Sequence, residues 1–288
     1  MSLTIKPTGA TLGAHVTGID LSRLTGTLWE EVERAFHEFA LLIFPDQGLT
    51  ADEQVAFAER FGEIEQVSPG NKIFPITNVR SDGSLMDDED LAMELMRGNE
   101  YWHTDSSYMP ISARASIFSA EIVPTVGGQT EWADMRAAWA ALDSSTREKV
   151  STLSAHHSIY YAQHRIGHKV ARGASYGMSE APPPLRPLVK FHPVTGTPSL
   201  FIGRHAHAIV GLSEAESESL LDQLLDFSCR APRTFAHNWR AGDVVVWDNR
   251  CLLHRARPYP HNQPRRMWHT RIAGDPVTEN AQPPAGTV

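Results

Sequence analysis

Cysteine is scarce in this sequence, because only Cys229 and Cys251 occur among 288 residues. Two cysteines cannot build the disulfide framework that stabilises small secreted domains. Cys251 also stands in an apolar, strand-like run. We therefore expect both side chains to be reduced, buried thiols in a cytoplasmic protein.

Long apolar runs are missing as well. No segment approaches the roughly 18 apolar residues that suggest a membrane-spanning helix. The first residues, MSLTIKPTGATLG, lack the basic start and apolar centre of a signal peptide. We expect neither an export signal nor a membrane partner.

The sequence also lacks an excess of positive charge. It has 26 Lys and Arg against 34 Asp and Glu, which gives a net charge of −8. A nucleic-acid-binding surface needs a basic face to replace phosphate counterions, so the composition argues against a nucleic-acid partner. A small anionic substrate remains compatible, because a few convergent arginines dominate the charge of a pocket.

Internal repeats, low-complexity tracts and interdomain linkers are absent from the sequence. Hydrophobic residues make up 41% of the chain and charged residues 21%, as in ordinary soluble proteins. Predominantly β folds often reach this length as one domain. We expect residues 1–288 to form a single domain.

Apolar spacing and capping signals predict five helices. Thr50 and Ser213 each precede a glutamate by three residues, which is the capping-box pattern at a helix start. The predicted helices cover residues 27–38, residues from 50 toward Gly62, 134–142, 144–153 and 213–227.

Most of the remaining sequence reads as strands and turns. Hairpins are predicted within residues 11–22 and between residues 234–239 and 244–248, and single strands at 40–44, 115–123 and 265–273. Strands on both sides of a helical insertion predict a β-sandwich or jelly roll with helices packed outside. Residues 71–100 and 172–187 look irregular, as solvated loops or as lids over a site.

His103, Asp105 and His254 form the most informative pattern in the chain. Two imidazoles and one carboxylate are the ligand set of non-haem Fe(II) oxygenases, which leaves three positions open on the metal. On a strand, residues two apart point to the same side, so His103 and Asp105 would act together. The alternative for the histidines is a hydrogen-bonded surface pair.

Three further residues favour the metal site over that alternative. Thr130 follows the Gly127-Gly128 turn on a predicted strand, and Arg265 and Arg271 share one face of the last strand. A dicarboxylate bound to the metal needs a cation at its far end, which an arginine fork and a threonine hydroxyl supply. A second arginine suits an anionic substrate. Arg266 remains an alternative to Arg265, since it stands beside it.

With these residues, the chain resembles the taurine dioxygenase and 2,4-dichlorophenoxyacetate dioxygenase family of Fe(II)/2-oxoglutarate enzymes. The matching stretches run in order from about residue 5 to residue 275. They include Ala40-Leu-Leu-Ile-Phe44, Trp102-His-Thr-Asp105, Val126-Gly-Gly-Gln-Thr130, Ala133-Asp-Met-Arg-Ala-Ala138, Trp247-Asp-Asn-Arg250, Leu253-His-Arg255 and Arg271-Ile-Ala-Gly274. Leu185-Arg-Pro-Leu-Val-Lys190, Ile202-Gly-Arg-His-Ala-His-Ala208 and Met267-Trp-His-Thr-Arg271 look like the (S)-selective phenoxypropionate, or aryloxyalkanoate, branch.

The resemblance implies a double-stranded β-helix that holds Fe(II) on the three residues of the metal pattern and uses 2-oxoglutarate and O₂ as cosubstrates. Thr130 and Arg265 would bind the distal carboxylate of 2-oxoglutarate, and Arg271 the anionic group of the substrate. Further substrate contacts would come from Asn99, Arg204, His205 and His207. The implied reaction is hydroxylation of the ether-bearing carbon of an aryloxyalkanoate, as in herbicide degradation. The family also implies a homo-oligomer.

Other histidine pairs are weaker candidates. His205 and His207 have strand spacing for a metal but lack a third ligand, so we expect no second metal there. His164 and His168 are four residues apart without the acidic partner of a zinc motif, and a solvated helix face is the simpler interpretation.

Two alternatives to the aryloxyalkanoate reaction stay open. The same machinery suits an alkyl sulfate or a sulfonate such as taurine. A metal-binding β-sandwich without turnover is the alternative from another class. The open three-ligand pattern argues against it, because a structural zinc site is usually closed by a fourth protein ligand.

Overall fold

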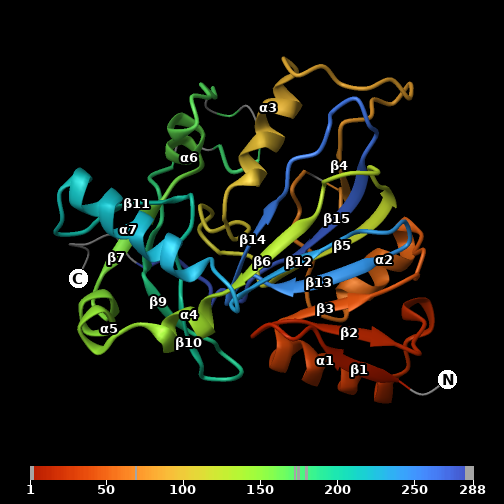
Figure 1. Cartoon of the computed structure of the whole chain (residues 1–288), viewed down its shortest axis with the longest axis horizontal. Coiled ribbons are helices and arrows are strands. Elements are labelled where there is room, and N and C mark those ends of the chain that lie inside the picture. Colours follow the sequence, from red (N-terminus) through yellow and green to blue (C-terminus); the bar gives the residue numbers. More distant parts are fainter. Residues whose placement is uncertain (1–2, 69, 172, 174–175, 179–180, 283–288) are drawn as a thin grey trace.

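A seven-stranded sheet lies at the centre of the structure, with strand order β1–β2–β3–β13–β5–β15–β4 (Figure 1). The computed structural model describes residues 3–68, 70–171, 173, 176–178 and 181–282. The strands of this sheet are β1 (Thr4–Pro7), β2 (Ala14–Thr17), β3 (Leu41–Phe44), β4 (Phe74–Thr77), β5 (Ala115–Ile122), β13 (Val244–Asp248) and β15 (Arg266–Ile272).

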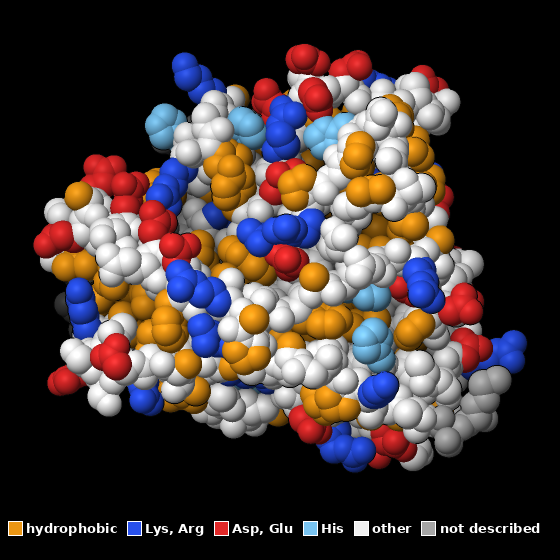
Figure 2. All heavy atoms as spheres, viewed as in Figure 1, with side chains coloured by type: hydrophobic (Ala, Val, Ile, Leu, Met, Phe, Trp, Pro, Cys, Tyr) orange, Lys and Arg blue, Asp and Glu red, His pale blue; other side chains and the backbone are white. Residues whose placement is uncertain are grey.

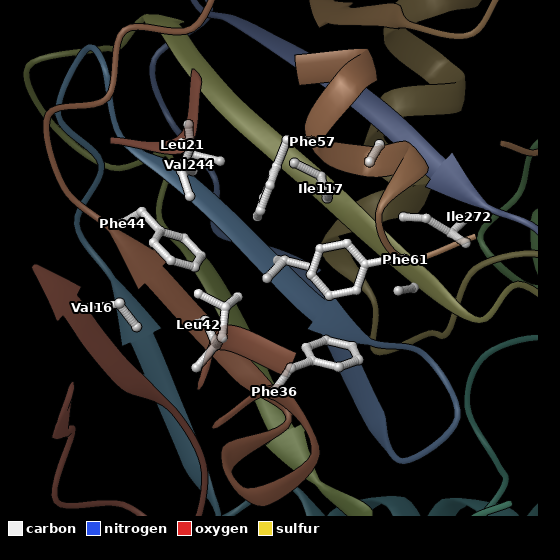
Figure 3. Close-up of a cluster of buried hydrophobic side chains, with 14 of the residues drawn as sticks. Val16, Leu21, Phe36, Leu42, Phe44, Phe57, Phe61, Ile117, Val244 and Ile272 are labelled. Carbon is white, nitrogen blue, oxygen red and sulfur yellow. The ribbon is translucent and has the colours of Figure 1, made fainter. Parts of the chain in front are cut away.

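Strand β13 shows how the sheet buries both faces. Val244 and Val246 point to one face, where helices α1 (Gly26–Phe39) and α2 (Ala51–Glu59) pack (Figure 3). Val245 and Trp247 point to the opposite face. This alternation follows from the two-residue repeat of a strand, and an apolar run such as β13 is what a strand covered on both sides requires.

A three-stranded sheet, β12–β6–β14, packs against that opposite face. It consists of β6 (Thr130–Asp134), β12 (Thr234–His237) and β14 (Leu252–Ala256). Trp132 of β6 and Trp247 of β13 meet edge to face between the sheets, with ring centroids 5.7 Å apart. The two facing sheets form the expected double-stranded β-helix, and the functional residues described below lie at one end of it.

A second group of elements packs beside the two sheets around its own apolar core (Figure 1). Its helices are α4 (Met135–Ala141), α5 (Ser144–Ser151), α6 (Ile159–Arg165) and α7 (Glu214–Ser228). Its strands form the small sheets β11–β7–β8 and β10–β9: β7 (Ser154–His157), β8 (Leu185–Pro187), β9 (Val189–Phe191), β10 (Pro198–Leu200) and β11 (Ala206–Ile209).

All five predicted helices are present. Both capping boxes form: the Thr50 hydroxyl accepts from the main chain of Glu53, and Ser213 accepts in the same way from Glu216. Two of the four unpaired N–H groups at each helix start are thereby satisfied. Capping is a local interaction, so the sequence specified these boundaries to within one or two residues.

The predicted hairpin between residues 234–239 and 244–248 is wrong in its pairing. Strands β12 and β13 exist, but β12 pairs with β6 while β13 pairs with β3 and β5. The turn at residues 240–243 therefore carries the chain from one sheet to the other. Turn residues predict where the chain reverses, whereas burial of the two faces decides which strands pair.

Two other expectations need correction. The first hairpin joins β1 and β2, so it begins seven residues before the predicted range 11–22, which instead ends in the 3₁₀ turn η1 (Leu21–Arg23). The stretch 71–100 is not irregular, because it contains β4, helix α3 (Leu91–Arg97) and the turn η2 (Gly98–Glu100). Strand β4 gains its stability by pairing with β15, which its own sequence does not reveal. Parts of the stretch 172–187 lie outside the described residues.

Acidic and basic side chains are interspersed on the face shown in Figure 2. Among the described residues, no helix is both long and apolar enough to cross a membrane. Both cysteines are free thiols; Cys251 is buried as expected, whereas Cys229 is only partly covered.

Candidate active site

His103 and His254 are joined directly through their main chains. The amide of His103 donates to the carbonyl of His254 at 3.0 Å, and the reciprocal bond is 2.8 Å. Their rings consequently lie close together, with centroids 4.1 Å apart. The pairing brings together two residues that are 151 positions apart in the chain.

Asp105 reaches the same point from a turn rather than from a strand. The predicted strand through His103 and Asp105 is wrong: His103 forms only the isolated bridge to His254, and the chain turns after it, with a positive φ of 54° at Ser106. Even so, Asp105 Oδ2 lies 3.9 Å from His254 Nε2. Convergence therefore comes from the turn and not from strand alternation.

These three side chains form a buried ligand group. One donor atom from each lies within 4.8 Å of the others. The Nδ1–H of His103 donates to the carbonyl of Tyr101 at 2.8 Å, which leaves Nε2 with its lone pair free. Burial lowers the pKa of His103 to about 3 and that of His254 to about 4, so both rings are neutral.

The charges and the open geometry of this group fit a divalent metal. Burial opposes ionisation of Asp105, but Arg271 and the neighbouring histidines hold the pKa of Asp105 well below its usual range. The donors are thus two neutral imidazoles and one carboxylate. Within the described residues no fourth His, Cys, Asp or Glu joins them. Three donors on one side leave the remaining positions of an octahedral ion open to other ligands.

A directed chain of hydrogen bonds fixes the carboxylate of Asp105. The indole N–H of Trp247 donates to Asn249 Oδ1 at 3.1 Å, and Asn249 Nδ2 donates to Ser116 Oγ at 2.9 Å. Ser116 then donates to Asp105 Oδ2 at 2.6 Å. Sequence reasoning missed Ser116, since a serine in an apolar strand carries no motif. Asn249 belongs to the stretch Trp247-Asp-Asn-Arg250, which supported the family resemblance, but no function was predicted for it.

Behind the ligand group lies a narrow space of about 60 Å³, which we call the far cavity. Thr130, at the start of β6, and Arg265, just before β15, line it together with His269. The indole N–H of Trp239 donates to Thr130 Oγ1 at 3.0 Å, so the hydroxyl proton of Thr130 remains available. Burial lowers the pKa of Arg265 to about 10, which still keeps its guanidinium charged.

The structure distinguishes between the two adjacent arginines. Arg265 is 5% exposed and faces the far cavity. Arg266 points away and pairs with Glu121 on the surface at 3.1 Å. Strand alternation brings His269 and Arg271 to the same side as Arg265. His269 had no predicted role, yet its Nε2 lies 3.7 Å from Asp105 Oδ2.

Arg271 lies between two carboxylates. Its Nη2 is 3.2 Å from Asp105 Oδ1, and its Nε is 3.9 Å from Glu65 Oε2. Arg271 Nη1 and Glu65 also share Ser106, whose hydroxyl donates to Glu65 and accepts from the guanidinium. Sequence analysis missed Glu65, because an acidic residue shortly after a helix gives no signal of burial. Burial raises the pKa of Glu65.

A larger space of about 200 Å³, the front cavity, opens beside His103 and Asp105. Arg271 forms part of its wall, and so do the apolar side chains of Ile76, Leu95 and Met96. The predicted residues Asn99, Arg204 and His205 line it as well. His205 Nδ1 and Ser107 Oγ form a hydrogen bond of 3.1 Å.

The structure does not bring His207 to either cavity. The main chain has a positive φ of 46° at Ala208, next to a register shift between β11 and β7, and His207 stacks on Tyr161 with centroids 4.6 Å apart. We therefore drop His207 as a substrate contact. His164 lies in α6, but the helix ends at Arg165, so His168 does not share its face.

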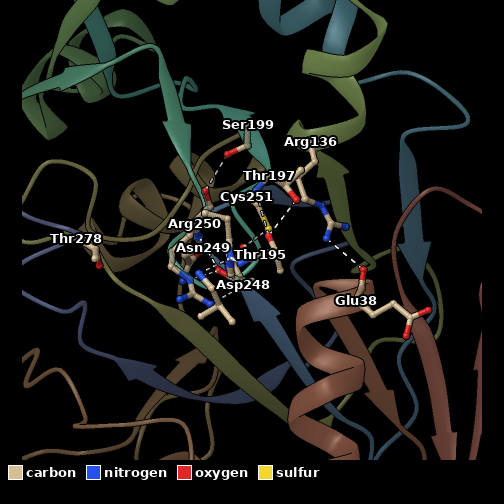
Figure 4. Close-up of polar contacts among 12 residues, drawn as sticks. Glu38, Arg136, Thr195, Thr197, Ser199, Asp248, Asn249, Arg250, Cys251 and Thr278 are labelled. Atoms are coloured by element: carbon tan, nitrogen blue, oxygen red, sulfur yellow. Dashed lines mark hydrogen bonds and ion pairs between the residues drawn. The ribbon is translucent and has the colours of Figure 1, made fainter.

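A second cluster, formed by His37, His192 and Asp248, resembles a metal site in spacing only. Arg250 donates to Asp248 at 2.8 Å through Nε (Figure 4). His192 Nε2 lies 3.0 Å from the same carboxylate. Both oxygens of Asp248 are thus already engaged, and the guanidinium would repel a cation. The cluster instead fixes the turn between β13 and β14. Strand β14, which follows this turn, contains His254.

Comparisons with known proteins show which family the chain belongs to. The family model described as "Taurine catabolism dioxygenase TauD, TfdA family" matches residues 4–271. A (S)-phenoxypropionate/alpha-ketoglutarate-dioxygenase of Sphingobium herbicidovorans is 54% identical over 283 residues, covering 96% of this chain and 97% of the relative. An alpha-ketoglutarate-dependent 2,4-dichlorophenoxyacetate dioxygenase of Cupriavidus pinatubonensis is 35% identical and covers 96% of this chain and all of the relative.

The fold has close relatives among solved structures. The crystal structure of AAD-2 in complex with Mn(II) and N-oxalylglycine superposes with a TM-score of 0.90 at 35% identity, covering 98% of this chain and 100% of the other. The family model and the relatives agree along almost the entire length. The chain therefore belongs to the taurine catabolism dioxygenase TauD, TfdA family.

Proposed function

We propose that this chain is an Fe(II)- and 2-oxoglutarate-dependent dioxygenase that hydroxylates the ether-bearing carbon of aryloxyalkanoates. The observation that carries the proposal is the open ligand group of His103, Asp105 and His254 between two cavities. One cavity contains the buried Arg265, and the other combines apolar walls with Arg271. The relative named for (S)-phenoxypropionate, at 54% identity, supports the aryloxy substrate class.

The three ligand residues would hold Fe(II). When bound, the metal would supply the oxidising chemistry that converts 2-oxoglutarate and O₂ to succinate and CO₂ while one oxygen atom enters the substrate. The protein contributes the fixed ligand geometry. The hydrogen-bond chain ending at Ser116 keeps the Asp105 carboxylate in one orientation.

In this proposal, Arg265 and Thr130 bind the distal carboxylate of 2-oxoglutarate. The guanidinium offers two parallel N–H donors to a carboxylate, and the free proton of Thr130 offers a third. Both side chains are almost fully buried. The far cavity is therefore shielded from bulk solvent, which strengthens these charge-assisted bonds.

Arg271 would anchor the carboxylate of the substrate in the front cavity. Its charge is held between Asp105 and Glu65, so the carboxylate of a ligand joins an existing network. The aromatic ring would lie against Ile76, Leu95 and Met96. Asn99, Arg204 and His205 are further candidate contacts. Anchoring at one end fixes which hydrogen of the ether-bearing carbon faces the metal.

The products follow from the position of hydroxylation. A hydroxyl group on the carbon that bears the ether oxygen gives a hemiketal when the substrate is a 2-aryloxypropionate. The hemiketal then loses the aryloxy group, so that a phenol and pyruvate form. No side chain of the site has to act as a general base in this scheme.

We further propose that residues 1–288 act as one domain and that the enzyme is a cytoplasmic homo-oligomer without nucleic-acid or membrane partners. Size-exclusion chromatography with light scattering tests the oligomer, since a monomer at assay concentration would contradict it.

The reaction is tested by loading the protein anaerobically with Fe(II) and 2-oxoglutarate and then adding O₂ with one candidate substrate. The candidates are both enantiomers of an aryloxypropionate, 2,4-dichlorophenoxyacetate, an alkyl sulfate and taurine. Equal amounts of phenol and succinate from one propionate enantiomer are expected. Succinate formed only with the sulfate or taurine would keep the reaction type and reject the aryloxy substrate. No succinate with any candidate would reject the proposal.

A further inference from the structure

Two arginines line the front cavity, and they differ in the charges around them. Arg204 donates to the main-chain carbonyls of Gly98 and Ala162, and it forms no ion pair with any described residue. Burial lowers the pKa of Arg204 to about 10, so its guanidinium remains charged. Arg271, in contrast, has a carboxylate directly behind it, because Glu65 Oε2 lies 3.9 Å from its Nε.

The main chain holds Glu65 beside Arg271. The amide of Glu65 donates to the carbonyl of Arg271 at 2.8 Å, and the preceding residue, Ile64, pairs with Ile272 in an isolated bridge. Both isoleucines belong to the same buried core, and the side chain of Glu65 is 13% exposed. Because this segment is attached to the end of β15, the carboxylate stays next to the guanidinium.

Ser106 connects the two charges through hydrogen bonds of fixed direction. A guanidinium can only donate, so Arg271 Nη1 donates to Ser106 Oγ at 3.1 Å. The hydroxyl proton of Ser106 is then directed to Glu65, whose carboxylate oxygens lie 2.8 and 2.9 Å away. Burial raises the pKa of Glu65, whereas Arg271 and the Ser106 hydroxyl favour its charged form. Glu65 and Arg271 thus form a pair without net charge.

Aromatic rings shield this pair from solvent. The guanidinium carbon of Arg271 lies 5.8 Å from the ring centre of Phe74 and 5.6 Å from that of Tyr176. Arg271 also donates to the hydroxyl of Tyr108, whose pKa is raised by burial to about 12, so that the phenol is neutral. Charges interact more strongly in such surroundings than in water, so one added or removed charge alters the affinity for an anion.

The charges around the ligand group and the two cavities indicate which ligand is accepted. In the proposed complex, Fe(II) and Arg265 together offset Asp105 and the two carboxylates of 2-oxoglutarate. Arg271 and Glu65 offset each other. Among the described side chains that line the front cavity, Arg204 then remains without a counter-charge. One negative charge on the ligand offsets it, whereas a second would be buried without a partner, which is costly.

We propose that Glu65 is a specificity-determining residue that restricts the front cavity to ligands with a singly charged head group. Glu65 acts through Arg271 rather than by touching the ligand, because the described cavity wall includes Arg271 but not Glu65. This role of Glu65 rests on the proposed function, since the anionic end of the substrate is taken to lie at Arg271. It adds a residue that decides how much charge that end carries.

Three probes with the same aryloxy group separate charge from shape: 2-phenoxypropionate and its analogues with a sulfonate or a phosphonate in place of the carboxylate. The sulfonate and the phosphonate are both tetrahedral. Above the second ionisation of the phosphonate, they carry one and two negative charges. Binding is measured by calorimetry with protein loaded with Mn(II) and N-oxalylglycine, which cannot turn over. Succinate release is measured separately with 2-phenoxypropionate, Fe(II) and 2-oxoglutarate.

The wild type should bind the sulfonate about tenfold more tightly than the phosphonate. Glu65→Gln removes the charge but keeps an oxygen that accepts from Ser106, and it should shift this ratio about tenfold toward the phosphonate. Glu63→Gln removes an equal charge from an exposed side chain two residues away and should leave the ratio unchanged. Ser106→Ala breaks the hydrogen bonds but retains both charges, so it should not change the ratio either. Thermal unfolding checks that each variant folds.

An unchanged ratio in Glu65→Gln would overturn the role of Glu65, and so would a wild type that binds the sulfonate and the phosphonate equally. An equal shift in Ser106→Ala would also overturn it, because hydrogen-bond geometry and not charge would then set the preference. The expected shift without any succinate from the wild type would keep the charge selection and reject the proposed function. Succinate formation with an unchanged ratio would do the reverse. Failure of every probe to bind would reject both.

Discussion

Exchange of Arg265 for methionine tests the assignment of the far cavity, and the adjacent Arg266 supplies a matched control. Arg265 is 5% exposed and lines the far cavity with Thr130. Arg266 is paired with Glu121, and its side chain is 25% exposed. The same substitution at two neighbouring positions therefore removes a buried charge in one case and a surface charge in the other.

The structure gives the size of the expected effect. A guanidinium fork on a carboxylate forms two charge-assisted hydrogen bonds, each contributing about 1.5–3 kcal/mol. Thr130 still reaches the carboxylate after the exchange and offsets part of the loss. We take the net loss as about 3 kcal/mol, which weakens 2-oxoglutarate binding about 150-fold. Arg266→Met removes a surface ion pair that contributes about 0–1 kcal/mol to stability, and it should not alter that affinity.

The assay is an anaerobic calorimetric titration of Fe(II)-loaded protein with 2-oxoglutarate and with 2-oxopentanoate, in which a methyl group replaces the distal carboxylate. The wild type should prefer 2-oxoglutarate by about two orders of magnitude. Arg265→Met should lose most of this preference, whereas Arg266→Met should retain it. Comparing the two ligands in both proteins isolates the arginine–carboxylate pair from other effects of the substitution.

Either of two results would refute the reasoning. If Arg265→Met kept the preference for 2-oxoglutarate, the guanidinium would not bind the distal carboxylate. If Arg266→Met lost it instead, the adjacent arginine would occupy the far cavity, contrary to its position beside Glu121.

Three further predictions concern metal binding and stability. Ser116→Ala removes the bond to Asp105 Oδ2 and should weaken Fe(II) binding about tenfold in an equilibrium titration, and an unchanged affinity would contradict the role of the hydrogen-bond chain. Arg186→Met removes a buried guanidinium that donates to four main-chain carbonyls, three of them in the loop after Asp105, and should lower the free energy of unfolding in urea by about 3–5 kcal/mol. The same substitution at Arg165, in an exposed ion pair, should lower the free energy of unfolding by less than about 1 kcal/mol. Equal losses in Arg186→Met and Arg165→Met would refute the structural role of the buried Arg186. Burial first, and then nearby arginines, lower the pKa of His37 from 6.5 to about 4. As the pH falls, the unfolded chain therefore binds a proton at His37 before the native state does. The free energy of unfolding should consequently decrease as the pH drops from about 6.5 towards about 4. His37→Phe should reduce that pH dependence in urea unfolding, and an unaltered slope would count against it.

Local interactions explain why the helices could be predicted. The capping boxes at Thr50 and Ser213 involve residues three apart, and the apolar stripe of α1 repeats within its own length. No distant partner is needed to specify such boundaries. The predicted pairing of residues 234–239 with 244–248 failed for the opposite reason, because sheet partners are chosen by burial over the whole fold.

In the metal site, too, some features could be predicted from the sequence and others depend on tertiary packing. The identity and spacing of His103, Asp105 and His254 predicted a three-donor group only together with Thr130, Arg265 and Arg271. The strand that was to align His103 with Asp105 does not exist, and a turn with a positive φ at Ser106 brings the carboxylate into place. Glu65 and Ser116 could not be found from the sequence, because neither residue belongs to a motif and their burial arises only from packing.

The sequence by itself determined the ligand types, the helices, the apolar alternation of the strands and the resemblance that names the family, since these depend on residue identity and short-range spacing. Tertiary structure alone decided that Arg265 and not Arg266 faces the far cavity, and that His207 turns away from both cavities. The physical reason is that strand register, turns and bulges rotate side chains by whole faces. The direction in which a side chain points therefore depends on contacts with residues that are far away in the chain.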